Sequence, residues 1–150
     1  MERIHLDLPA TFPFHTELPV RISDINYGRH LGNDTMLAFL HEARLRFLAR
    51  SGLSETDVGD CGLIMVDAVV LFKSQAFHGE TLVVEVAPRD LSRCGCDFIY
   101  RVSEKASGRE VARAKTGLVC FDYAKGKMTK APDRFRAALG ADPAAAETVS

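Results

Sequence analysis

The spacing of hydrophobic positions changes from one part of the chain to the next. Residues 20–23 alternate apolar with polar side chains, as a short half-buried strand does. Residues 24–34 are rich in Gly, Asn and Asp, which predicts a polar loop made of turns. From residue 35 to residue 48 apolar side chains recur at steps of three and four, which predicts a helix with Gly52 at its C-terminal end.

Four segments rich in Val, Ile, Phe and Tyr follow this helix, separated by turn residues. They cover residues 63–73, 81–90, 96–104 and 110–123. One early helix followed by long strands with short connections is typical of an α+β fold, in which the helix packs on one antiparallel sheet. Residues 132–139 predict a short second helix, and the Ala-rich residues 140–150 a flexible tail, so a single domain is expected to cover residues 1–139.

The composition narrows the classes of function. A chain of 150 residues with 47% hydrophobic and 26% charged residues is ordinary for one globular domain. Its formal net charge of -1 gives no source for the electrostatic attraction that nucleic-acid binding requires. No apolar stretch is long enough to span a bilayer, and residues 1–16 lack the basic start and apolar run of a signal peptide. We therefore expect a protein that binds neither nucleic acid nor membrane.

The cysteines favour a reducing compartment. Cys61, Cys94, Cys96 and Cys120 show neither the paired CxxC spacing of a metal site nor the density of a secreted disulfide scaffold. We therefore expect a cytoplasmic protein with free thiols and no bound metal.

Two segments of the chain resemble a known family. VRISDINYGRHLGN, residues 20–33, and FLHEARLRFL, residues 39–48, are similar to the 4-hydroxybenzoyl-CoA thioesterase-like family of hot-dog proteins. The residues that match the family pattern are Asp24, His30, Asn33, Ala43 and Arg44. The resemblance implies a hot-dog fold, an antiparallel β-sheet wrapped around one central α-helix. It also implies hydrolysis of an acyl-CoA or acyl-carrier thioester without a cofactor, by a homodimer or homotetramer whose sites lie between subunits.

The chain departs from the family pattern at two positions. Asn26 stands where related thioesterases carry the second aspartate of an Asp-x-Asp motif, which acts as nucleophile or general base. An asparagine side chain neither accepts a proton usefully nor forms an acyl anhydride. His41, with Glu42 beside it, occupies the family's acidic position on the helix, where a hydrogen bond on the helix face would also satisfy it. If the chain is an enzyme, another group must therefore activate water.

The polar loop supplies groups that thioester hydrolysis needs. His30 can act as a general base near neutral pH, and Asp34 could orient it. Asn26 or Asn33 could donate a hydrogen bond to the carbonyl oxygen or hold the water. The unpaired N–H groups of the first helical turn add donors for an oxyanion. The predicted catalytic residues are therefore Asp24, Asn26, His30, Asn33, Asp34 and Glu42.

Several of these residues also have a purely structural interpretation. Asp24 could bond turn amides, and Asn33 or Asp34 could be only the N-cap of the helix. Glu42 could form an ion pair with Arg46, one helical turn later.

Two basic residues near strand ends are candidates for binding coenzyme A. Lys73 and Arg93 could contact its phosphates, although solvated faces explain most such charges. No Gly-rich phosphate loop joins a strand to a helix, so a nucleotide-hydrolysing function has no support.

Three classes of function remain open. They are an acyl-CoA thioesterase, a hot-dog hydratase or dehydratase, and a noncatalytic acyl-thioester binder. A dehydratase would place a His and an acid around acyl carbons beyond the carbonyl, whereas this loop places its polar groups at the start of the helix. Asn26 gives weight to the binder, and the resemblance favours the thioesterase.

Overall fold

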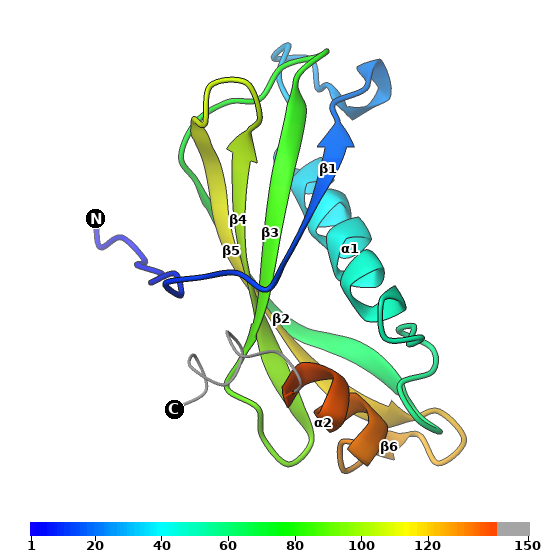
Figure 1. Cartoon of the computed structure of the whole chain (residues 1–150). Coiled ribbons are helices and arrows are strands. Elements are labelled where there is room, and N and C mark those ends of the chain that lie inside the picture. Colours follow the sequence, from blue (N-terminus) through cyan, green and yellow to red (C-terminus); the bar gives the residue numbers. More distant parts are fainter. Residues whose placement is uncertain (141–150) are drawn as a thin grey trace.

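The computed structural model describes residues 1–140 as one sheet with a long helix on one face (Figure 1). The elements in chain order are β1 (Phe14–Pro19), the 3-10 helix η1 (Ile22–Asp24), α1 (Asn33–Ala49), β2 (Gly62–Phe72), β3 (Thr81–Arg89), β4 (Gly95–Glu104), β5 (Glu110–Asp122), β6 (Lys127–Met128) and α2 (Asp133–Gly140). Residues 141–150, which include all but the first residue of the expected tail, lie outside the described part.

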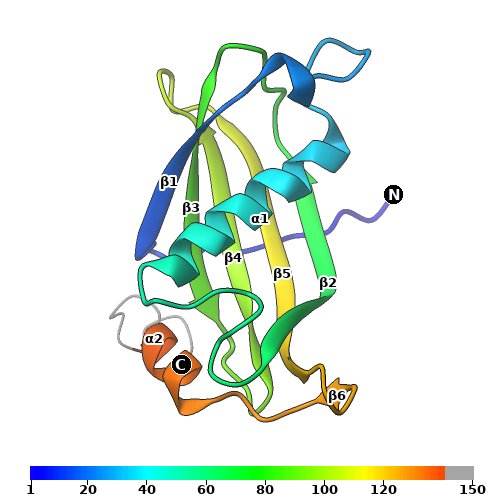
Figure 2. The same ribbon diagram turned by 90° about the vertical axis from the view of Figure 1, so that its right-hand side faces the viewer.

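The strands are antiparallel and lie in the order β1-β3-β4-β5-β2, with β6 paired to β5. Helix α1 crosses one face of this sheet, and the segment before β1 runs across the opposite face (Figure 2). The predicted α+β architecture of one long helix on one antiparallel sheet is confirmed. Among residues 1–140, no helix is long and apolar enough to cross a membrane.

The apolar stripe of α1 forms the centre of the core. Its buried apolar side chains are Met36, Phe39, Leu40, Ala43, Phe47 and Leu48. The Phe47 ring packs edge-to-face between the rings of Phe14 on β1 and Phe98 on β4, at centroid distances of 5.8 and 5.5 Å. The 3.6-residue period of the stripe thus fixes which face of the helix meets the sheet.

The N-terminal arm, meaning the residues before β1, covers part of the outer face of the sheet. Two arginines on the strands bind its backbone: Arg89 Nη1 donates to the Asp7 carbonyl at 3.0 Å, and Arg113 Nη1 donates to the Leu6 carbonyl at 3.3 Å. Ile99 of β4 is fully buried but is not part of the core beneath α1. The arm therefore adds a partial third layer.

Strand β2 is a long edge strand with exposed apolar side chains. It ends the strand order, so its outer edge pairs with no other strand of the described chain. Met65 and Phe72, which lie opposite buried residues of β5, are 47% and 50% exposed because α1 lies nearer to β1 and β3 than to β2. An edge that is both long and apolar is suited to pairing with a second chain.

Three local expectations from the sequence were wrong. Residues 20–23 are not a strand, because the Asp24 carboxylate accepts the Arg21 N–H at 2.8 Å and folds this segment into η1. The first strand is β1, which lies just before residues 20–23. It was not predicted, because Pro19 was taken to end an irregular N-terminal segment. The helix also stops at Ala49 with Arg50 as its C-cap, and Gly52 takes up a positive φ of 70° only in the following turn.

Candidate active site at the start of helix α1

The loop between η1 and α1 is a compact turn that presents His30. The Asn26 N–H donates to the His30 carbonyl, and the Arg29 N–H donates to the Asn26 carbonyl, both at 3.0 Å. Arg29 has a φ of 67°, a left-handed conformation that closes the turn. The Leu31 N–H donates to the Ala76 carbonyl at 2.8 Å, which holds the loop against the segment after β2.

Asp24 stabilises this loop through its side chain and its backbone carbonyl. Its carboxylate is buried and bonded to the Arg21 N–H, while its backbone carbonyl accepts the Gly32 N–H at 3.2 Å. The predicted bonding of a turn amide by Asp24 is thus confirmed. Its carboxylate lies in a different pocket from His30, together with Glu42.

One hydrogen bond of the His30 ring indicates which ring nitrogen can accept a proton. Its Nδ1 lies 3.0 Å from the Leu31 carbonyl oxygen, which can only accept. The neutral imidazole therefore carries its proton on Nδ1 and leaves Nε2 as a proton acceptor. Asp34 makes no hydrogen bond to His30 within residues 1–140, so the expected orienting role belongs to the Leu31 carbonyl instead.

The first turn of α1 offers free backbone donors. Met36 N–H, bonded to the Gly32 carbonyl, makes the first bond of the helix, so the N–H groups of Asn33, Asp34 and Thr35 have no partner within it. The N-cap is Gly32 rather than Asn33 or Asp34, and no side chain caps it. A Cβ atom at Gly32 would lie 2.6 Å from Asp34 Oδ1, the end of an exposed side chain that would have to turn away. These amides sit at the positive end of the helix dipole, where an oxyanion is stabilised.

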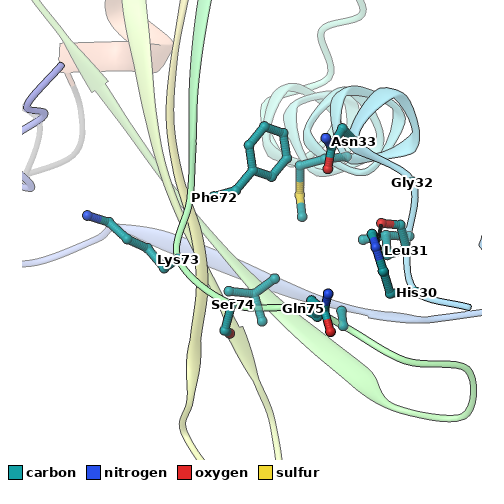
Figure 3. Close-up of a pocket in the computed structure, with 11 residues that line it drawn as sticks. His30, Leu31, Gly32, Asn33, Phe72, Lys73, Ser74 and Gln75 are labelled. Atoms are coloured by element: carbon teal, nitrogen blue, oxygen red, sulfur yellow. Dashed lines mark hydrogen bonds between the residues drawn. The ribbon is translucent and has the colours of Figure 1, made fainter. Parts of the chain in front are cut away.

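A pocket of about 260 Å³ opens beside these donors (Figure 3). We call it the helix-start pocket. Its labelled lining residues are His30, Leu31, Gly32, Asn33, Phe72, Lys73, Ser74 and Gln75. Phe72 points toward the helix, whereas the ammonium end of Lys73 points away from His30 and Asn33 (Figure 3).

The structure brings only some of the predicted residues together. Asn26 is exposed in the same loop, with its Oδ1 accepting the Gly28 N–H at 3.0 Å. Glu42 lies on the other side of α1, where it forms the predicted ion pair with Arg46 at 2.9 Å. Arg93 lies in the turn before β4, at the end of the sheet far from Lys73, so one chain does not bring these two cations together.

A second pocket, of about 360 Å³, lies farther along α1. It is called the arginine pocket here and is lined by Leu37, Ala38, His41, Arg44, Glu55, Leu63, Met65, Thr116 and Leu118. Within it Arg44 Nε donates to Glu55, and His41 Nε2 lies 2.8 Å from the same carboxylate. The expectation that a hydrogen bond satisfies His41 is therefore confirmed. Glu55 was missed because it lies in an irregular loop with no motif around it.

The buried end of this pocket carries a charged chain of hydrogen bonds. Arg44 Nη1 donates to Tyr100 Oη at 3.1 Å, and Tyr100 Oη lies 2.7 Å from Thr116 Oγ1. Burial works to lower the pKa of Arg44, but Tyr100 and Glu55 outweigh it and raise that pKa above its usual value. Burial raises the pKa of Tyr100, against the opposing effect of Arg44. Arg44 therefore stays charged and Tyr100 stays neutral.

Known proteins are similar to this chain in both sequence and fold. A family model described as the thioesterase-like superfamily matches residues 20–139. A 1,4-dihydroxy-2-naphthoyl-CoA hydrolase from Synechocystis sp. is 29% identical over 131 residues, which cover 84% of this chain and 94% of the relative. The crystal structure of a 1,4-dihydroxy-2-naphthoyl-CoA thioesterase from Synechocystis has a TM-score of 0.78 at 27% identity and covers 85% of this chain and 95% of that one.

A more distant structure agrees in fold. A thioesterase from Thermus thermophilus, crystallised with coenzyme A and Zn, has a TM-score of 0.76 at 22% identity over 87% of this chain and 93% of that chain. The predicted hot-dog fold and the predicted class of thioester hydrolase are thereby confirmed at the level of the family. The chain belongs to the thioesterase-like superfamily.

Proposed function

We propose that this protein hydrolyses acyl-CoA thioesters at the start of α1. The observation that carries the proposal is that His30, whose neutral ring keeps Nε2 as an acceptor, and the first turn of α1, whose N–H groups have no partner within the helix, line one pocket in a chain of the thioesterase-like superfamily. One group can accept a proton and the other can bind a developing oxyanion. Hydrolysis of a thioester requires both.

In the proposed reaction His30 Nε2 takes a proton from water as the water oxygen attacks the thioester carbonyl carbon. The carbonyl electrons move to its oxygen, which the free amides of Asn33 and its neighbours bind as an oxyanion. When the intermediate collapses the carbon–sulfur bond breaks, and the imidazolium of His30 returns its proton to the thiolate. Asn26, which cannot act as a base, holds the turn by accepting the Gly28 N–H and would help to orient the water.

We further propose that the active form is a homodimer paired through β2. A two-fold axis makes the two β2 strands antiparallel, so the Phe72 end of one strand lies beside the Leu63 end of the other. The helix-start pocket of one subunit then lies next to the arginine pocket of its partner, because these pockets sit at opposite ends of β2. Exposed Met65 and Phe72 would be covered in the same step.

Coenzyme A binding and location complete the proposal. Lys73 lines the helix-start pocket with its ammonium group directed away from His30 and Asn33, so it would meet a coenzyme A phosphate outside the reacting centre, and Arg93 could join it only from another subunit. The four cysteines are free, and Cys61, Cys96 and Cys120 are buried, which fits a cytoplasmic protein. Asp34 and Glu42 stay candidates for a carboxylate that acts if His30 does not.

The test is release of free thiol from a panel of acyl-CoA esters by the purified protein and by His30→Ala. Removal of a general base should lower turnover by roughly a hundredfold to ten-thousandfold. His15→Ala, which removes an exposed histidine of β1, is the matched control and should leave turnover unchanged. Full turnover by a well-folded His30→Ala protein at every pH would remove His30 from the mechanism.

A further inference from the structure

Residues 73–80, which join β2 to β3 and are called the β2–β3 connection here, form one wall of the helix-start pocket. Gln75 of this connection lines the pocket together with His30 (Figure 3). The next residue, Ala76, is 2% exposed and belongs to the core beneath α1. Its carbonyl accepts the Leu31 N–H at 2.8 Å. The connection therefore contacts the loop that carries His30 through the main chain of Ala76.

This contact anchors the loop of His30. Within the described part of the chain, the bond from the Leu31 N–H to the Ala76 carbonyl is the one backbone hydrogen bond that joins residues 25–31 to a segment remote in the sequence. The Leu31 carbonyl in turn lies 3.0 Å from His30 Nδ1 and is the acceptor of that ring. A displacement of Leu31 would therefore turn or release the imidazole.

A carboxylate fixes the same peptide group from its other side. The peptide that joins Ala76 to Phe77 carries both the carbonyl that Leu31 binds and the Phe77 N–H. That N–H donates to Glu80 Oε1 at 2.7 Å. A carboxylate bonded to a peptide N–H polarises the peptide, which strengthens the hydrogen bond that its carbonyl accepts. Glu80 therefore orients the Ala76 carbonyl and also makes it a better acceptor.

Arg109, in the turn between β4 and β5, holds both Glu80 and the β2–β3 connection. Its Nη2 donates to the two carboxylate oxygens of Glu80 at 3.0 and 3.1 Å and to the Gln75 carbonyl at 2.9 Å. Its Nε donates to Ser74 Oγ at 3.2 Å. The rigid guanidinium thus binds three groups of the connection at once, which a lysine ammonium on a flexible stem would not reproduce.

Closing the turn between β2 and β3 does not require this pair. Gly79 has a φ of 89°, and the Glu80 N–H donates to the Phe77 carbonyl at 3.1 Å, so the main chain closes the turn locally. The neighbouring turn between β4 and β5 is also held locally, because the Glu104 carboxylate accepts N–H groups of the two residues that follow Lys105. The pairing of Glu80 with Arg109 instead adds a constraint at the point where the connection meets the loop of His30.

We propose that Glu80 and Arg109 are positioning residues for His30. They fix the Ala76–Phe77 peptide group, this group holds Leu31, and the Leu31 carbonyl keeps the imidazole proton on Nδ1. Nε2 is then free to accept the proton of water. Neither Glu80 nor Arg109 lines the helix-start pocket, so both act through the main chain and not on the reacting atoms. This inference rests on the proposed role of His30.

The test observes the imidazole directly, by nitrogen-15 NMR at about pH 8.5, where an ordinary histidine of pKa about 6.5 is neutral. The His30 signals are identified by their loss in His30→Ala. Wild type should show His30 in the Nδ1–H form, and Glu80→Ala should show a mixture of both tautomers. In thiol release, Glu80→Ala should lower kcat about tenfold to a hundredfold, because a small misplacement of a catalytic group is costly, and should change KM less than about twofold.

The conservative variant separates positioning from loss of charge. Glu80→Gln keeps a carbonyl oxygen that can accept the Phe77 N–H, so it should retain the Nδ1–H form and most of kcat. The matched control is Glu85→Ala, because Glu85 also pairs with an arginine, Arg101, and is 24% exposed against 22% for Glu80, but lies on the outer face of the sheet. It should change neither the tautomer nor kcat.

The outcomes distinguish this inference from the proposed function. A folded Glu80→Ala protein with His30 in the Nδ1–H form and unchanged kcat would overturn the inference, as would equal losses in Glu80→Ala and Glu85→Ala or a change in KM alone. If Glu80→Ala does not fold, Arg109→Lys is measured in its place against the same criteria. If the wild-type protein cleaves no ester, the proposed function fails, and the tautomer of His30 alone decides the inference.

Discussion

Replacing Tyr100 by Phe tests whether the buried hydrogen-bond chain also holds α1 to the sheet. The Tyr100 hydroxyl is fully buried and bonds two partners, Arg44 Nη1 at 3.1 Å and Thr116 Oγ1 at 2.7 Å. A hydrogen bond to a charged group contributes about 1.5–3 kcal/mol and a neutral one about 0.5–1.5 kcal/mol. The free energy of unfolding should therefore fall by roughly 3 kcal/mol, since both partners also lose their bond to the hydroxyl.

The assay is urea unfolding and thermal melting at one fixed protein concentration, because the proposed pairing would make stability depend on concentration. For a chain of this size the loss corresponds to a decrease in Tm of roughly 6–12 °C. Tyr123→Phe is the matched control, because Tyr123 is largely exposed and its hydroxyl makes no hydrogen bond among residues 1–140. A loss of less than about 0.5 kcal/mol in Tyr100→Phe, the usual scatter of neutral substitutions, would refute the reasoning.

Three further predictions concern the site, the assembly and acid stability. Asn26→Asp restores a carboxylate in the same loop as His30. This variant should preserve or raise thiol release, and it should partly rescue His30→Ala. An Asn26→Asp protein that folds but is inactive would contradict this. Met65→Lys should give a monomer by light scattering and should reduce thiol release. Met128→Lys, at a similarly exposed methionine of β6, should change neither the oligomeric state nor thiol release. A dimeric Met65→Lys protein would show that β2 is not the interface. The N–H groups of Ala106 and Ser107 bind the Glu104 carboxylate and lower its pKa, so its contribution to stability is present above the usual value of 4.5 and is lost as pH falls through the lowered pKa. The stability difference between wild type and Glu104→Gln should therefore shrink on acidification, and a difference that stays constant from neutral pH to pH 3 would exclude this role.

The regular elements could be predicted because their side chains repeat with the period of the structure. The apolar spacing of residues 35–48 predicted α1 to within two residues at its start, and the four long strands agree within one residue at every end. Strand β1 was not predicted, because Pro13 precedes its six residues and Pro19 ends them, and both prolines suggested an irregular segment. Which strands pair could not be predicted, since the order β1-β3-β4-β5-β2 depends on contacts remote in the chain.

One part of the candidate site could be predicted from the sequence and another part could not. His30 and the free amides of α1 could be predicted because they lie in one continuous loop and helix start. The arginine pocket could not, because Arg44 meets Tyr100 across 56 positions of the chain, and Glu55 stands in an irregular loop. Only the folded sheet brings these groups together. The N-cap was also misassigned, because Asn33 and Asp34 already have helical backbone conformation and Gly32, which has no side chain to act as a cap, holds the N-cap position.

The arm before β1 is held by hydrogen bonds to its main chain and by the Phe12 ring, which lies 5.4 Å from the guanidinium carbon of Arg101. Arg89 and Arg113 bind carbonyl oxygens of Asp7 and Leu6, groups that every amino acid carries. The side chains of Asp7 and Leu6 can therefore change with little effect on these two bonds, whereas the two arginines cannot be exchanged for lysine without losing the directed N–H groups. An arm attached in this way also occupies part of the outer face of the sheet (Figure 2). Another molecule could stack on that part of the sheet only if the arm first detached.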